Sequence, residues 1–131
     1  MSQPVKVLIA DDEQIMREGL RLTIDWESYG FSVIGAVSNG EKALRLCEEE
    51  TPDLVITDIR MPVMSGLEAA RQIRAMSRTD AQTVPIIAMT ANAYEEDVSQ
   101  SLAAGMNAHL AKPIEPQVIL DTLAGYIGSK N

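Results

Sequence analysis

Short apolar runs alternate along the chain with longer segments in which apolar residues recur at helical spacing. The apolar runs are rich in β-branched residues and predict five strands, at residues 5–10, 31–37, 53–57, 85–90 and 107–112. The segments that follow them place apolar residues three or four positions apart, which predicts a helix after each strand. This alternation is typical of an α/β domain, in which helices cover both faces of a parallel sheet.

Residue types at the ends and on the faces of the helices make these predictions more specific. Serine followed three residues later by glutamate predicts a capping box at Ser38 with Glu41 and another at Ser65 with Glu68. The polar segment 77–83 predicts a loop. The apolar residues at helical spacing, expected on buried faces, are Ile15, Met16, Leu20 and Ile24; Val98 and Leu102; and Ile119, Leu123 and Ile127.

Length and composition indicate one domain, 1–131, with its core at about 5–127. The chain has 131 residues, of which 46% are hydrophobic. Its formal net charge of −8 argues against direct nucleic-acid binding by this domain, because phosphate contacts need clustered lysine and arginine. No apolar stretch approaches the roughly 20 residues of a membrane helix. The single cysteine, Cys47, excludes an internal disulfide. We therefore expect a cytoplasmic domain with no membrane insertion.

Polar residues stand at the ends of four predicted strands. Asp11 and Asp12 follow the first strand, Asp58 follows the third, Thr90 ends the fourth and Lys112 ends the fifth. In a doubly wound sheet of order 2-1-3-4-5 these ends are neighbours at one edge, where such sheets bind ligands. Three carboxylates in one cleft repel one another and favour a hard divalent cation, for which Mg²⁺ is the best match. Lys112 adds a positive charge and Thr90 adds a hydroxyl donor.

Further motifs accompany these strand ends, namely Met61-Pro62 with Gly66 following, Thr90-Ala91 and Lys112-Pro113. With them, the chain resembles the receiver domain of two-component response regulators over roughly residues 5–127. The resemblance implies a (βα)5, flavodoxin-like fold, with a doubly wound five-stranded parallel sheet of order 2-1-3-4-5. It also implies a signal-transduction phosphoprotein that catalyses only its own phosphorylation and dephosphorylation, and is not otherwise an enzyme.

The resemblance assigns Mg²⁺ ligands residue by residue. Asp58 is similar to the phosphoacceptor, which takes a phosphoryl group from a phosphohistidine to form an aspartyl phosphate, and which also faces the metal. Asp12 resembles the direct metal ligand, and Asp11 resembles the residue that holds a metal-bound water. The backbone carbonyl of Arg60 would complete the ligands from the protein.

Other residues resemble those that contact and sense the phosphoryl group. Thr90 looks like the hydroxyl that contacts the phosphoryl oxygens, and Ala91 would offer its backbone N–H there. Lys112 looks like the residue that pairs with Asp58 or its phosphoryl group, and the peptide bond before Pro113 is cis in this family. His109 stands where the family usually has Tyr or Phe at a switch position. Because histidine titrates near neutral pH, we expect altered or pH-sensitive coupling there.

The resemblance also implies partners. A histidine kinase or a histidine phosphotransfer protein would donate the phosphoryl group, and an output domain or partner protein would read the surface around strands four and five. Phosphorylation could also produce a homodimer. Residues 25–27 and 57–62 resemble receivers of DNA-binding regulators, whereas residues 88–93 and 104–114 resemble receivers of hybrid histidine kinases. The second set is longer and favours the hybrid-kinase context slightly.

Three other functions fit parts of the pattern. A phosphatase of the aspartyl-phosphate type also uses an Asp nucleophile and Mg²⁺, but its Asp-x-Asp motif follows the first strand, where this chain has Asp-Asp-Glu. A flavodoxin-like cofactor binder needs a Ser/Thr/Gly-rich phosphate loop at that point, and three acids would repel phosphate. A degenerate receiver that works without phosphate is opposed by the complete set of acids, Thr90 and Lys112.

Overall fold

A single parallel sheet forms the centre of the protein. The structure, a computed structural model, describes residues 3–90, 95–112 and 114–128. In this part of the chain, five parallel strands are arranged in the order β2-β1-β3-β4-β5. The strands are β1 (Val5–Ala10), β2 (Phe31–Val37), β3 (Leu54–Asp58), β4 (Ile86–Thr90) and β5 (Ala108–Ala111). The predicted doubly wound α/β fold and its strand order are confirmed.

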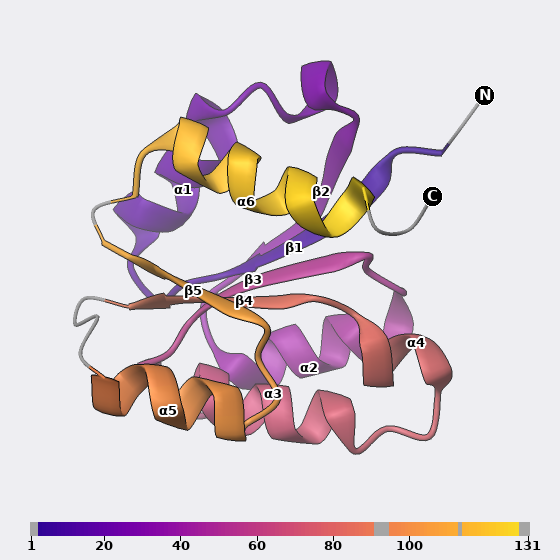
Figure 1. Ribbon diagram of the computed structural model, residues 1–131, viewed down its shortest axis with the longest axis vertical. Coiled ribbons are helices and arrows are strands. Elements are labelled where there is room, and N and C mark those ends of the chain that lie inside the picture. The colour runs from indigo at the N-terminus through magenta and orange to yellow at the C-terminus, as the bar shows by residue number, and fades with distance from the viewer. Residues whose placement is uncertain (1–2, 91–94, 113, 129–131) are drawn as a thin grey trace.

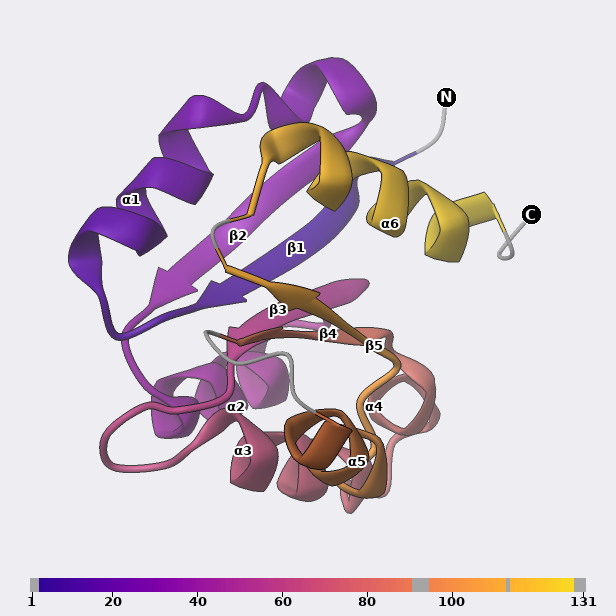
Figure 2. The same cartoon turned by 60° about the vertical axis from the view of Figure 1, so that its left-hand side comes forward.

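Helices cover both faces of the sheet (Figure 1 and Figure 2). One face carries α1 (Gln14–Thr23) and α6 (Pro116–Gly128). The opposite face carries α2 (Gly40–Glu49), α3 (Gly66–Arg74), the short α4 (Thr79–Thr83) and α5 (Glu95–Ala103). A 3₁₀ helix, η1 (Trp26–Tyr29), connects α1 to β2 and ends at Gly30, whose φ is 84°. Among the described helices, none has both the length and the apolar character needed to cross a membrane.

Successive residues of the inner strands face two separate hydrophobic cores. In β1, Val7 and Ile9 pack in the core beneath α1 and α6, whereas Leu8 and Ala10 pack in the core beneath α2 and α3. All four side chains are 0% exposed. A strand between two layers of helices needs apolar residues on both faces, which explains why the inner strands appear in the sequence as continuous apolar runs.

The two predicted capping boxes have different outcomes. Ser65 is the N-cap residue of α3, and its Oγ accepts a hydrogen bond from the Glu68 backbone N–H at 3.2 Å, which confirms the serine half of the prediction; the Glu68 carboxylate accepts instead from Gln72 Nε2 at 3.1 Å. The prediction for Ser38 is wrong, because α2 begins one residue later. Its N-cap is Asn39, whose Oδ1 accepts from the Lys42 N–H at 2.9 Å. Asparagine is at least as good an N-cap residue as serine, so the two neighbours compete for this role.

The predicted loop at 77–83 is wrong in part, because residues 79–83 form α4. Arg78 precedes this helix and donates a hydrogen bond from its guanidinium to the carbonyl of Glu48, at the end of α2, at 3.1 Å. Ala81 is buried under the turn. Tertiary contacts of this kind stabilise a short helix whose polar sequence would not form one alone.

Two residues expected on buried faces are exposed. Ile15 is 88% exposed, because α1 turns Leu20 and Ile24 toward the sheet and Ile15 away from it. Leu102 is 58% exposed, and among residues 98–103 of α5 it is Ser101 that is buried. The Ser101 hydroxyl donates to the carbonyl of Val98 at 3.0 Å, which satisfies a polar group that would otherwise be costly to bury.

Gly66 permits a very close approach between the start of α3 and the end of β3. The Gly66 N–H donates to the carbonyl of Ile59 at 2.9 Å. A Cβ atom at this position would lie 2.1 Å from the backbone oxygen of Asp58. The backbone of Asp58 therefore keeps its place only if residue 66 has no side chain.

We expect Gly66→Ala to lower the free energy of unfolding by at least about 2 kcal/mol, because backbone must move to relieve the contact. Urea unfolding followed by circular dichroism measures this change. Gly125→Ala is the matched control, since a Cβ at Gly125 meets no atom within 4 Å. That variant should be more stable by up to about 1 kcal/mol, because alanine favours a helix. Equal stability of the Gly66 variant and wild type would contradict the interpretation.

Candidate functional site

The parallel register places the ends of the inner strands at one edge of the sheet. Ala10 at the end of β1 lies opposite Thr57 of β3, and each is followed by an aspartate. The Lys112 N–H donates to the Thr90 carbonyl at 2.8 Å, which fixes the end of β5 beside the end of β4. The backbone pairing of the sheet therefore decides which polar residues meet.

A pocket of about 250 Å³ opens at this edge. The residues that line it are Asp12, Glu13, Asp58, Ile59, Arg60, Thr90 and Lys112. The structure thus brings together most of the residues singled out from the sequence. The roles that the resemblance assigned to them stay predictions.

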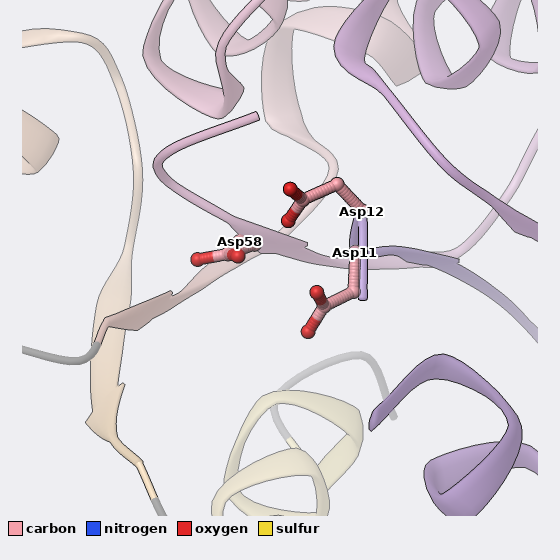
Figure 3. A group of neighbouring side chains, drawn as sticks. All are labelled: Asp11, Asp12 and Asp58. Carbon is pink, nitrogen blue, oxygen red and sulfur yellow. The ribbon is translucent and has the colours of Figure 1, made fainter. Parts of the chain in front are cut away.

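Three carboxylates meet beside the pocket, from the ends of two neighbouring strands (Figure 3). One oxygen each of Asp11, Asp12 and Asp58 lie within 4.8 Å of one another. Asp11 is 0% exposed and Asp58 is 7% exposed, whereas Asp12 is exposed. Such a set of oxygen donors with an excess of negative charge is typical of Mg²⁺ sites.

The ammonium group of Lys112 lies within ion-pair distance of three acids. Its Nζ atom is 3.1 Å from Asp11 Oδ2, 3.2 Å from Asp58 Oδ2 and 3.5 Å from Glu13 Oε1. The lysine side chain is only 12% exposed, so solvent screens the two inner contacts weakly. One positive charge therefore offsets part of the repulsion among several carboxylates.

The two oxygens of Asp11 have different surroundings. Oδ1 accepts a hydrogen bond from the Glu13 N–H at 2.9 Å, which fixes the carboxylate. Oδ2 is buried, and its one partner among the described residues is the Lys112 ammonium group at 3.1 Å. A carboxylate oxygen can accept more than one contact, so a cation or its bound water can also bind there. The residues present therefore fit a bound Mg²⁺.

Burial and charge shift the pKa values of two of these groups. Burial raises the pKa of Asp58, the Lys112 charge lowers it, and the Asp11 and Asp12 charges raise it, with an upward result. Burial alone lowers the pKa of Lys112, but its contacts with Asp11 and Asp58 outweigh burial and raise it. Lys112 therefore stays charged in the folded protein, whereas the charged form of Asp58 is less favourable there than it is in water.

The remaining predicted residues have varied positions. Arg60 is exposed and lines the pocket, while the role of its carbonyl stays a prediction. His109 is half-buried on β5 opposite Ala88, outside the residues that line the pocket. Ala91 and Pro113, and with them the expected backbone contact and the cis peptide bond, lie outside the described residues.

Sequence reasoning assigned no role to Glu13, which lines the pocket and lies near Lys112. The one sequence signal was its place directly after the acid pair. An acid at the start of a helix is common on solvent-exposed surfaces, so this signal alone does not separate a site residue from a surface residue.

Comparison with known families decides what kind of domain this is. A family model described as the response regulator receiver domain matches residues 7–124. The chain belongs to this family. The resemblance inferred from the strand-end motifs is confirmed.

Curated relatives of this receiver domain include transcriptional regulators. The chain is 36% identical over 118 residues to the uncharacterized transcriptional regulatory protein YesN of Bacillus subtilis. It is 33% identical over 121 residues to the nitrate/nitrite response regulator protein NarL of Escherichia coli. The matches cover 90% and 92% of this chain, but only 31% of YesN and 54% of NarL. The chain thus spans about a third to a half of the length of these relatives.

A solved structure with a metal ion is similar to this receiver domain. It is the receiver domain of a sensor histidine kinase from Pseudomonas aeruginosa, with a magnesium ion coordinated in the active site cleft. The TM-score is 0.83 and the sequence identity is 34%, over 95% of this chain and 98% of the other. The acid cluster of this chain and the likeness to a magnesium-bound domain together support a divalent-cation site.

The raised pKa of Asp58 predicts a pH dependence of stability. The folded state binds this proton more tightly than the unfolded state, so the contribution of Asp58 is greatest at low pH. That contribution is lost as the pH rises from the ordinary aspartate value of about 4 through the raised value. Without divalent cations, we therefore expect Asp58→Asn to be more stable than wild type near neutral pH, and the difference to disappear in acid.

Urea unfolding in the presence of EDTA, at a series of pH values, measures this difference. Asp121→Asn, at an exposed position on α6, is the control and should follow the wild-type pH profile. A stability difference between Asp58→Asn and wild type that stays constant with pH would contradict the role given to the buried carboxylate.

Proposed function

We propose that this receiver domain accepts a phosphoryl group on Asp58 from the phosphohistidine of a histidine kinase or histidine phosphotransfer protein. The observation that carries the proposal is the meeting of Asp58, two further aspartates, Thr90 and Lys112 at one pocket. In the transfer, an Asp58 carboxylate oxygen bonds to phosphorus while the P–N bond breaks. The electron pair of that bond leaves on the imidazole nitrogen, and an aspartyl phosphate remains.

The chain's own residues supply position and charge for this reaction. Phosphoryl transfer depends mainly on positioning and on stabilising the charge of the transferring oxygens. Lys112 Nζ, 3.2 Å from Asp58 Oδ2, places a positive charge beside the acceptor atom. Thr90 is 4% exposed at the next strand end, where its hydroxyl can contact a phosphoryl oxygen. The backbone of Asp58 is fixed by the close contact with Gly66.

Asp11, Asp12, Asp58 and the carbonyl of Arg60 would hold the Mg²⁺ of this site. The bound ion would supply positive charge that stabilises the transferring phosphoryl oxygens. Without it, one ammonium group faces three aspartates, so the donor's phosphoryl oxygens would meet net negative charge. Phosphorylation should accordingly require a divalent cation.

Catalysis in this proposal is limited to the domain's own phosphorylation and dephosphorylation. The output would lie in another domain or protein that reads the surface around β4 and β5. Likeness to transcriptional regulators and to a receiver domain of a histidine kinase supports either setting. The acidic composition, with a net charge of −8, supports an output other than nucleic-acid binding by this domain itself. Phosphorylation would also favour a homodimer if the changed surface is self-complementary.

Incubation with acetyl phosphate and Mg²⁺, followed by intact-mass analysis, tests the proposed acceptor. We expect one phosphoryl adduct on the wild-type chain, and none on Asp58→Asn or in EDTA. Asp80→Asn, at an exposed position in the first turn of α4, is the matched control and should be phosphorylated like wild type. No adduct on a folded wild-type chain that binds Mg²⁺, from acetyl phosphate or a phosphorylated histidine donor, would contradict the proposal.

We further propose that Thr90 transmits phosphorylation to β5. It ends β4, and its carbonyl accepts the backbone N–H of Lys112 at 2.8 Å, so a shift of Thr90 acts directly on the end of β5. Phosphorylation adds negative charge at Asp58, toward which the Thr90 hydroxyl can turn. The balance between two arrangements of this edge would then change.

Amide hydrogen exchange of β4 and β5, with and without acetyl phosphate, tests this coupling. In wild type, phosphorylation should change the exchange of residues 108–111. In Thr90→Ala, we expect phosphorylation to persist within about tenfold of the wild-type rate, because one hydroxyl contact is lost, but the exchange of β5 to stay unchanged. Thr83→Ala, on α4, serves as the control and should behave as wild type. A normal response of β5 in Thr90→Ala would exclude this route.

A further inference from the structure

Glu13 occupies the N-cap position of α1 without capping the helix. Ser, Thr, Asp and Asn are preferred at this position because their short side chains accept a hydrogen bond from the first helical turn. The Glu13 side chain makes no such bond. Its Oε1 instead lies 3.5 Å from Lys112 Nζ, 99 positions further along the chain. N-terminal capping does not explain this side chain, whereas the contact with Lys112 gives it a place in the site.

The three acids around Lys112 differ in depth. Asp11 and Asp58 are nearly or fully buried and contact the ammonium from within the site. The Glu13 side chain is 63% exposed and contacts it from the mouth of the pocket. Glu13 can therefore move with Lys112 at little cost, while the two aspartates are held by the packed strand ends.

A divalent cation and Lys112 compete for the same carboxylates. Asp11 and Asp58, whose Oδ2 atoms lie 3.1 Å and 3.2 Å from Lys112 Nζ, are also two of the three aspartates whose candidate ligand atoms lie within 4.8 Å of one another. Carboxylates that turn toward a cation attract Lys112 less strongly, so its contacts with Asp11 and Asp58 weaken although the ammonium group stays beside Asp58. The ion pair between Lys112 and Glu13 then contributes more to stability than it does in the cation-free protein. Any contact that is stronger in the loaded state increases affinity for the ligand.

We propose that Glu13 is a positioning residue for Lys112: its carboxylate holds the ammonium group at the pocket mouth more strongly when a divalent cation occupies the acid cluster, and this stronger contact tightens cation binding. The inference depends on the proposed function in one respect only, namely that a divalent cation binds at the acid cluster. Asp58 need not be phosphorylated for it to hold. The carboxylate must reach Lys112, so its position matters as well as its charge.

Two substitutions separate these effects. Glu13→Gln removes the charge, whereas Glu13→Asp keeps the charge but shortens the side chain by one methylene. Aspartate is also a preferred N-cap residue, so Glu13→Asp should raise the melting temperature even as it loses contact with Lys112. Glu18→Gln, at a half-buried acid on the same helix that pairs with Arg21, removes an equal charge away from the pocket.

Isothermal titration calorimetry of the full chain with Mg²⁺ at physiological salt measures the effect. We expect both Glu13 variants to raise the Kd for Mg²⁺ about threefold, because the loss of a partly exposed ion pair has an effect of this size. Glu18→Gln should leave the Kd nearly unchanged. Thermal melting without Mg²⁺ would show that both Glu13 variants fold, with the aspartate variant the more stable.

A wild-type Kd for Glu13→Asp, with weaker binding only for Glu13→Gln, would overturn the inference, because Glu13 would then act only as a nearby charge. A wild-type Kd for both variants would overturn it as well. Absence of Mg²⁺ binding by the wild-type chain would contradict the cation site itself. Normal Mg²⁺ binding without phosphorylation by any donor would instead contradict the proposed function and leave the effect of Glu13 measurable.

Discussion

The parallel register of the sheet is the constraint on which the site depends. Ala10 lies opposite Thr57 and Asp58 lies opposite Met89, so the residues that follow the strands meet at one edge. A slip of one residue in β3 would turn Asp58 to the other face and expose part of a buried strand. The packing of the two hydrophobic cores therefore fixes the strand register and, with it, the positions of the aspartates. Any register that moved the aspartates would also remove apolar side chains from both cores.

The electrostatics of this edge are unfavourable in the cation-free protein. Burial and two neighbouring acids raise the pKa of Asp58, and Lys112 offsets only part of that cost. Asp11 is fully buried, and Lys112 is the one partner of its Oδ2 atom among the described residues. Proteins keep such local violations mainly where function needs them. The glycine that lets α3 approach Asp58 has the same character, because residue 66 is fixed by geometry and not by helix propensity.

The strands could be predicted from the sequence because each inner strand is a short continuous apolar run with a polar residue at its end. Their order was predicted from the resemblance to receiver domains and not from these runs. The helices were less predictable. Asn39 and Ser38 are both good N-cap residues, and only the packed structure selects Asn39. Ser101 is buried although it is polar, because it bonds to the carbonyl of Val98. Periodicity of apolar residues cannot detect either case.

The residues of the site also divide into those that the local sequence pattern reveals and those that only the folded structure reveals. Asp58 could be singled out because a carboxylate ends a buried run, which is a local departure from the apolar pattern. Glu13 could not, because its contact with Lys112 joins residues 99 positions apart, and an acid at a helix start looks like any exposed surface residue. Apart from its place after the acid pair, its local sign in the structure is a mismatch, since glutamate stands where a shorter polar residue would cap the helix better. A residue that is suboptimal for its own helix and contacts a distant charged group is therefore better explained by the site than by the helix.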